Sequence, residues 1–285
     1  MEEGFARHIR ACNNVTLPGD WHELWTRGQR VGWTRPRIAQ VLAEGLPGAV
    51  ASPYRVSVEN IGAAGRVLVE ARLARWRNEA FDVRAEIGGP VLGQVDRGAL
   101  PALGLLAEGV HLNALVRRAD GLHLWVARRA ADKALDPGKL DHLVAGGMPS
   151  GLSPWACLVK EAAEEAGLAE PLVRQAVAVE PVSYTMERPE GMRRDHLHCF
   201  DVELPEDFVP RAVDGEVAGF ELWPIARVVN TVRATDAFKF NVNLVLIGLF
   251  RRLGIIATPA PESPMRRDAP QGFVKAERRQ GERGS

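Results

Sequence analysis

The sequence has few cysteines, no excess of either charge and no long apolar run. Its three cysteines are widely spaced and odd in number, so no disulfide framework is expected and a reducing, cytoplasmic compartment is predicted. Lys plus Arg and Asp plus Glu both number 36, which argues against a nucleic-acid binder that works by bulk charge. Nothing approaches the roughly 18 consecutive apolar residues of a membrane span, and the N-terminus MEEGFARHIR lacks the apolar stretch of a signal peptide.

The rest of the composition is that of a globular protein. Hydrophobic residues make up 46% and charged residues 25% of the 285 positions, which is enough to bury a sizeable core. The length predicts one large domain or two of ordinary size, and the sequence leaves the oligomeric state open.

The first hundred residues are predicted to form a small mixed α/β domain over residues 1–105. Residues 31–42 and 92–106 resemble each other, and each has the pattern of a short strand, a turn and a helix. Further helices are expected at 5–12 and, with amphipathic spacing, at 66–77.

A second α/β domain is predicted over residues 106–257. Its expected strands are 110–116, 122–127, 175–182, 197–202 and 220–224, with an ordered loop at 130–151 and a final helix at 237–252. Residues 258–285 hold four prolines and ten charged residues among 28, which predicts a disordered tail.

One helix is clearly marked at both ends. Ser153 is suited to the N-cap, Pro154 to the first helical position and Gly167 to the left-handed residue after the last turn, so the helix should cover 154–166. At about 100° per residue, Glu161, Glu164 and Glu165 share one side, opposite the apolar side.

Two interpretations of these three glutamates are open. The simpler is a solvated acidic face, but Glu161 and Glu165 repel each other at i and i+4, and only Lys160 is placed to pair with Glu164. The other is a metal site, because the glycine-rich loop 145–151 can bring backbone carbonyls near the helix. Oxygen-only ligands suit Mg²⁺ or Mn²⁺, ions that neutralise a diphosphate and activate water against phosphorus.

At this point the sequence resembles the Nudix hydrolases. The family signature is Gly, five residues, Glu, seven residues, then Arg-Glu-U-x-Glu-Glu-x-Gly-U, where U is bulky and apolar. Gly146 fits the first position, and the end of the signature is matched by Glu161, Glu164, Glu165, Gly167 and Leu168. Two positions depart from it, since Leu152 replaces the first Glu and Lys160 replaces Arg.

The resemblance extends to one Nudix branch, which includes the Nudix domain fused to thiamine pyrophosphokinase in some fungi. It is carried by residues 111–113, 124–129, 133, 137–141, 183–184, 214–216 and 238–239, and by a similar preceding domain. The resemblance implies an α/β/α sandwich with a mixed sheet, and hydrolysis of a small-molecule diphosphate, with thiamine diphosphate or its oxidised analogues as a substrate class. It implies metal ligands at Gly146, Glu161, Glu164 and Glu165.

Other residues have both a functional and an ordinary interpretation. Glu216 resembles a late Nudix glutamate that binds metal or acts as general base, or it is a turn carboxylate. His111 and Asn113 share one strand face and either contact the leaving group or end a strand. Arg129 and Lys139 either hold phosphate oxygens or are solvated. Tyr184 could stack on a heteroaromatic or cationic ring.

The sequence therefore predicts a Mg²⁺-dependent (or Mn²⁺-dependent) pyrophosphohydrolase whose catalytic carboxylates are Glu161, Glu164, Glu165 and Glu216. The alternative is a catalytically weak binding or sensor protein on the same scaffold, which Leu152 and Lys160 favour. No membrane or nucleic-acid partner is expected.

Overall fold

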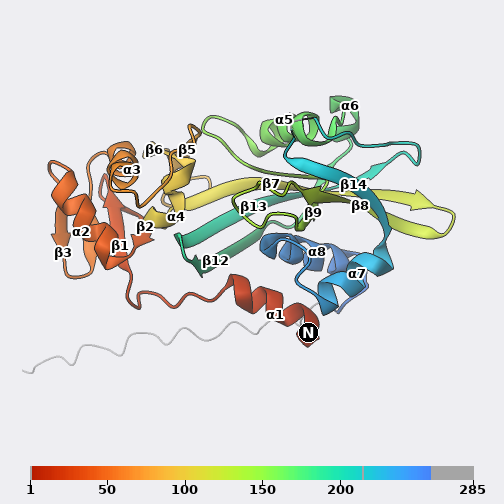
Figure 1. Cartoon of the computed structure of the whole chain (residues 1–285), viewed down its shortest axis with the longest axis horizontal. Coiled ribbons are helices and arrows are strands. Elements are labelled where there is room, and N and C mark those ends of the chain that lie inside the picture. The colour runs from red at the N-terminus through yellow and green to blue at the C-terminus, as the bar shows by residue number, and fades with distance from the viewer. Residues whose placement is uncertain (1, 214, 258–285) are drawn as a thin grey trace, which may run out of the picture.

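The computed structural model describes residues 2–213 and 215–257, so the predicted tail at 258–285 and Asp214 lie outside the described residues. Two groups of strands and helices follow each other along the chain, and the N-terminal helix returns to the second group (Figure 1). The predicted α/β class is confirmed. Among the described residues, no helix combines the length and apolar character that crossing a bilayer requires.

The first group, which we call the N-terminal unit, comprises residues 21–105. Strands β1 (His22–Thr26), β2 (Gln29–Thr34), β3 (Val50–Ser52) and β4 (Arg55–Ser57) form a sheet of order β2-β1-β4-β3, and β5 (Ala80–Val83) pairs with β6 (Gly93–Asp96). Helices α2 (Pro36–Gly45), α3 (Ile61–Glu70), the 3₁₀ turn η1 (Arg97–Ala99) and α4 (Leu100–Leu103) complete the unit. Its own apolar core includes Leu24, Leu42, Leu68 and Leu103.

The amphipathic helix predicted at 66–77 is displaced in the structure. Helix α3 begins at Ile61, because the Asn60 side chain accepts a hydrogen bond from the Ala63 N–H at 3.1 Å and caps the helix. It ends at Glu70, and Arg72 adopts a left-handed conformation with φ of 58°, which breaks the helical path. The pattern located a helix, but the capping residue rather than the apolar spacing determined where it begins.

Helix α1 (Glu3–Cys12) does not pack with the N-terminal unit. Its Phe5 ring meets Phe250 edge-on at 6.1 Å, and the Arg7 guanidinium donates a hydrogen bond of 2.5 Å to Asp236. By its contacts α1 lies with the C-terminal helices, as Figure 1 shows. The division at residue 105 stays a prediction. Helix α1, which that division assigns to the first domain, packs with the second group.

The second group is built on one mixed sheet. Its strands are β7 (Leu106–Arg118), β8 (Gly121–Arg129), β9 (Leu140–His142), β10 (Val144–Gly147), β11 (Val177–Ala178), β12 (Val182–Arg188), β13 (Gly191–Leu204) and β14 (Val217–Pro224). The order is β11-β13-β7-β8-β14, with β10 on β7, β12 on β13 and β9 on β8. Only β13 and β7 run parallel, so the sheet is mixed.

Helices cover both faces of this sheet. Helices α5 (Pro154–Ala166) and α6 (Glu170–Val173) lie on one face, and α7 (Ile225–Ala234) and α8 (Phe240–Arg252) lie on the other (Figure 1). Alternate residues of β7 serve the two faces: Val110 and Leu112 pack toward α5, and Leu115 packs toward α7 and α8. The predicted three-layer sandwich is confirmed.

The structure differs from the prediction at four places in this second group. The supposed loop at 130–151 contains β9 and β10, which are short and pair with β8 and β7. The strand predicted at 175–182 is mostly irregular, and the longer β12 begins only at Val182. Helix α7 was missed, and α8 begins at Phe240 rather than 237 because Phe238 forms a bridge with Leu140.

Candidate functional site

Helix α5 is fixed at both ends as the sequence predicts. The Ser153 hydroxyl accepts a hydrogen bond from the Ala156 N–H at 3.2 Å, Pro154 occupies the first turn, and Gly167 has φ of 61° at the C-cap. The apolar side of the helix, including Leu158 and Ala162, is buried against the sheet. The caps and the buried side together set the rotation of the helix and hence the direction of its glutamates.

The glycine strand β10 lies directly against Glu161. A Cβ atom added at Gly146 would lie 2.4 Å from the Glu161 carboxylate carbon, closer than any real contact allows. The neighbouring strand β7 also approaches β10 closely, since a Cβ at Gly109 would lie 2.8 Å from the Gly146 carbonyl oxygen. Only glycine at 146 leaves space for that carboxylate, so the structure brings Gly146 and Glu161 together as the metal-site prediction requires.

Glu165 is the most enclosed of the helix glutamates. It is 8% exposed, and its Oε2 accepts a hydrogen bond of 2.9 Å from the Ala145 N–H of β10. Burial raises the pKa of Glu165 well above its usual value, and the nearby charges of Asp141, Glu161 and Glu216 raise it further. Glu165 therefore joins the helix to the glycine strand and needs a positive partner to remain ionised.

Lys160 neutralises the outer part of the cluster. Its Nζ donates hydrogen bonds of 3.0 Å to Glu161 and 2.6 Å to Glu164. Burial raises the pKa of Glu161, and the hydrogen bond from Lys160 opposes this shift. As a point charge, Lys160 holds two carboxylates without the bidentate geometry that an arginine would supply.

Glu216 approaches the same carboxylates from the segment before β14. It forms an ion pair with Lys133, and its charge contributes to the raised pKa of Glu165. Burial raises the pKa of Glu216, but the hydrogen bond and charge of Lys133 outweigh it and lower the pKa overall. Four predicted carboxylates, Glu161, Glu164, Glu165 and Glu216, thus gather at one end of the sheet.

A buried network lies behind Glu165. Asp141 accepts a hydrogen bond of 2.7 Å from Arg129 Nη1 and lies 3.6 Å from Lys239 Nζ, while His111 Nδ1 and His142 Nδ1 are 2.9 Å apart. Burial would raise the pKa of Asp141, but Lys239 and the other surrounding positive charges lower it to about 2. Arg129 also donates to the carbonyls of Leu135 and Asp136, so its observed role is to hold the loop before β9.

The ligand atoms of His111, Asp141 and His142 lie within 4.8 Å of one another, so this group could also hold a metal ion. Two cations already balance its one carboxylate, however, which disfavours a further dication. The helix glutamates are oxygen ligands with a net negative charge, and they fit Mg²⁺ or Mn²⁺ better.

The buried histidines give a pH dependence of stability. Burial lowers the pKa of His142 to about 4, whereas an exposed histidine titrates near 6.5, so the unfolded chain binds more protons between these values. Stability should fall by roughly 3 kcal/mol through His142 as the pH drops across this window. Urea unfolding at several pH values should show a steeper loss for the wild type than for His142→Gln, and equal slopes would contradict the assignment.

The other predicted substrate residues are not brought to the glutamates. Asn113 is fully buried and donates a hydrogen bond of 2.7 Å to Asp201. Tyr184 is 3% exposed, donates its hydroxyl to Asp195 and packs edge-on against Phe240. Lys139 donates to the Asp236 carbonyl at 2.7 Å. Asn113 and Tyr184 are thus buried against structural partners, and the partly exposed Lys139 is bound to the Asp236 carbonyl.

Comparison with known proteins assigns this arrangement. Residues 108–243 match the model of the Nudix domain. These 136 residues are just under half of the chain. It is 44% identical over 187 residues to "Nudix hydrolase 20, chloroplastic" of Arabidopsis thaliana, and 45% identical over 188 residues to "Nudix hydrolase 24, chloroplastic" of the same plant. Each alignment covers 66% of this chain, and 49% and 51% of the relatives, so the chain spans about half their length.

Among solved structures, DR0079 from Deinococcus radiodurans is 24% identical, with a TM-score of 0.44 and coverage of 61% of this chain and 98% of that one. The names of the two plant relatives correct one prediction. Both are called chloroplastic, which contradicts the cytoplasmic location inferred from cysteine usage. Three buried thiols report a reducing environment, which several compartments provide, so they could not decide between them.

The packing before helix α5 explains how Leu152 is accommodated. Leu152 packs with Met148 and Trp155 against the core beneath α5. Leu152→Glu should therefore lower the stability by roughly 1–3 kcal/mol without raising the rate, because the new carboxylate loses water there. Thermal melting and the rate at increasing Mg²⁺ concentration test this, and a gain in both metal affinity and rate would contradict it.

Sequence reasoning missed several charged neighbours of the Nudix site. Asp141 and Lys239 belong to the segments 137–141 and 238–239 that carry the family resemblance. The sequence assigns neither of them a role, although they form the centre of the buried network. Arg97 belongs to the predicted strand, turn and helix at 92–106, and the sequence assigns it no role in the site because it precedes residues 108–243. No local pattern marks it, whereas the three-dimensional structure places its guanidinium carbon 3.5 Å from the position of a Cβ at Gly147, beside the glycine strand.

Proposed function

We propose that the Nudix domain is a Mg²⁺- or Mn²⁺-dependent pyrophosphohydrolase that cleaves the diphosphate linkage of a small molecule. The observation that carries this proposal is the packing of Gly146 against Glu161, with Glu164 and Glu165 on the same helix. It concentrates oxygen donors where side chains at 146 and 109 would otherwise fill the space. The names of the plant relatives support hydrolysis as the activity.

The position of each residue supports a different proposed role. Glu161, Glu164 and Glu165, with the Gly146 carbonyl, would hold a divalent ion, which when bound neutralises the diphosphate and favours attack by water. Glu216 and Glu161 are placed to accept the proton that the attacking water loses. Lys160, which pairs with Glu161 and Glu164, and Lys133, which pairs with Glu216, would lie beside the phosphates of a bound substrate.

The substrate class put first is thiamine diphosphate or its oxidised analogues. It is supported by the resemblance of residues 137–141, 183–184 and 238–239 to the branch that includes the thiamine pyrophosphokinase fusions. In the structure two of these segments lie together in the network around Asp141 and Lys239, behind Glu165. The substrate class is inferred from this sequence resemblance.

The alternative is a catalytically weak binding or sensor protein. Lys160 favours this alternative, because its ammonium group already pairs with Glu161 and Glu164. Mg²⁺-dependent release of the hydrolysis products from thiamine diphosphate, its oxo analogue, nucleoside diphosphate sugars and dinucleotides, followed by ion-exchange chromatography, separates the two. Saturable release from at least one compound supports the hydrolase. Binding without release from every compound supports the sensor.

A further inference from the structure

The N-terminal unit packs on the segment that leads into the Nudix helix. The Ser150 N–H donates a hydrogen bond of 2.8 Å to the Ala80 carbonyl of β5. The Phe81 ring lies against β10, since a Cβ atom added at Gly147 would be 2.8 Å from Phe81 Cζ. The hairpin of β5 and β6 therefore forms one wall beside the glycine strand.

Arg97 projects from this wall toward the carboxylates. Its guanidinium carbon is 3.5 Å from the position of a Cβ at Gly147, the residue after the one that faces Glu161. The guanidinium therefore lies one residue along β10 from the contact between Gly146 and Glu161.

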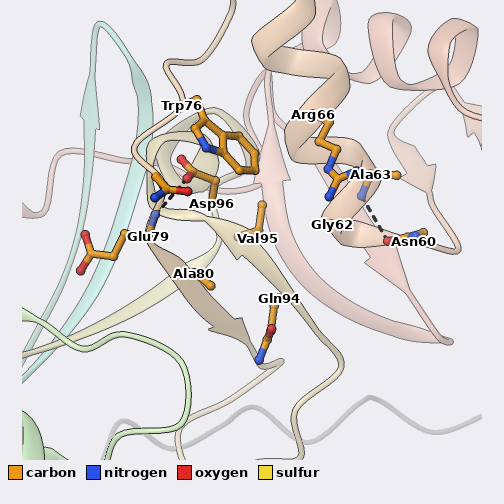
Figure 2. A pocket seen from close by; sticks show the side chains of 11 residues that line it. Asn60, Gly62, Ala63, Arg66, Trp76, Glu79, Ala80, Gln94, Val95 and Asp96 are labelled. Carbon is orange, nitrogen blue, oxygen red and sulfur yellow. Dashed lines mark hydrogen bonds between the residues drawn. The ribbon is translucent and has the colours of Figure 1, made fainter.

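The backbone around Arg97 is held by a buried carboxylate. Asp96 is 6% exposed and accepts hydrogen bonds from the backbone N–H groups of Arg77, Glu79 and Gly98 at 2.9, 3.2 and 2.8 Å. Arg97 N–H in turn donates to the Glu79 carbonyl at 2.8 Å. Figure 2 shows Asp96 beside Glu79, whose side chain points away from the pocket of about 410 Å³ lined by Trp76 and Gln94.

Glu79 orients the guanidinium and leaves most of its donors available. Arg97 Nη1 donates to Glu79 Oε2 at 2.8 Å, and among the described residues Glu79 is the one side chain that accepts a hydrogen bond from it. The Arg97 side chain is 50% exposed. A guanidinium has five N–H donors in a planar fork that matches a phosphate group. Lys160 and Lys133 already pair with the carboxylates of the site, whereas Glu79 lies outside that set.

We propose that Arg97 binds a phosphate group of the substrate, so that the N-terminal unit supplies part of the Nudix site. The inference rests on the proposed function in taking the ligand to be a diphosphate. It gives the N-terminal unit a direct role in substrate binding and explains why the hairpin of β5 and β6 is packed against β10.

Binding of inorganic pyrophosphate in the presence of Mg²⁺, measured by calorimetry on the full chain, tests the inference. Arg97→Ala should weaken binding by roughly tenfold to hundredfold, the range for losing a hydrogen bond between charged groups. The pyrophosphate affinity of Arg97→Lys should lie between those of the wild type and Arg97→Ala, because lysine keeps the charge and loses the planar fork of donors. Affinity for Mg²⁺ alone and the melting temperature should stay unchanged. Arg66→Ala, which removes an exposed arginine on the far wall of the pocket, is the matched control.

The outcomes separate this inference from the proposed function. Equal pyrophosphate affinity in wild type and Arg97→Ala overturns the role of Arg97, even if diphosphates are hydrolysed. Absence of pyrophosphate binding by the wild type also overturns it. Binding that depends on Arg97, with no hydrolysis of any diphosphate, supports the inference while the proposed hydrolase fails. With an active substrate, Arg97→Ala should raise KM more than it lowers kcat, and an effect confined to kcat would contradict a binding role.

Discussion

Replacement of Glu164 by Gln is expected to abolish turnover while the fold is kept. Glu164 is half-exposed on α5, and its side chain contacts Lys160 rather than the core, so the substitution keeps the volume and removes only charge. The lost charge belongs to the proposed metal site, where even supporting residues are worth about tenfold or more in activity or metal affinity. The rate at saturating Mg²⁺ should fall by well over tenfold, with an unchanged melting temperature.

Glu203→Gln is the control for this variant, because Glu203 is another exposed carboxylate paired with a cation, Arg117, far from α5 in the chain. It should keep the wild-type rate. A folded Glu164→Gln protein that retains more than about a tenth of the wild-type rate would count against the metal site.

Gly146→Ala is expected to have the second large effect. Its Cβ would lie 2.4 Å from the Glu161 carboxylate, so that carboxylate must move away from β10. A displacement of about 1 Å in a catalytic group can cost on the order of 100-fold in rate. We expect a loss of that size in kcat/KM, accompanied by a weaker response to Mg²⁺. The free energy of unfolding should change much less, because the Glu161 carboxylate is at the end of a flexible side chain that can rotate toward solvent.

Gly219→Ala provides the comparison, since a Cβ at Gly219 in β14 would meet nothing within 4 Å. It should leave both rate and stability near the wild-type values. If Gly146→Ala were equally harmless, Gly146 and Glu161 would not form a functional contact, and the metal site would have to be placed elsewhere.

Helix α5 could be predicted from sequence because its determinants are local. Ser153, Pro154 and Gly167 act through the backbone of their own helix, and the spacing of three glutamates fixes their common side. The boundaries 154–166 are the observed ones. The segment just before it was misjudged because β9 and β10 have three and four residues, and such short strands depend on pairing with β8 and β7.

The surroundings of the helix could not be predicted in the same way. His111 and Asn113 alternate on β7 as expected, yet the face they share is covered by α8 and the segments around it, which lie more than a hundred residues later. Tyr184 resembled a substrate contact in the sequence, whereas Asp195 and Phe240 enclose it in the structure. Burial of this kind depends on long-range packing, which a pattern of neighbouring residues does not encode.

The central claim is that the glutamates of α5 form a metal site for hydrolysis of a diphosphate. The most direct test is release of the hydrolysis products by the wild type and by Glu161→Gln/Glu164→Gln, measured across a Mg²⁺ titration and after chelation with EDTA, on a compound that the wild type hydrolyses. We expect release by the wild type that rises with Mg²⁺ and stops with EDTA, and no release by the double variant at any Mg²⁺ concentration. Release that persists in EDTA, or that the folded double variant matches, would contradict it.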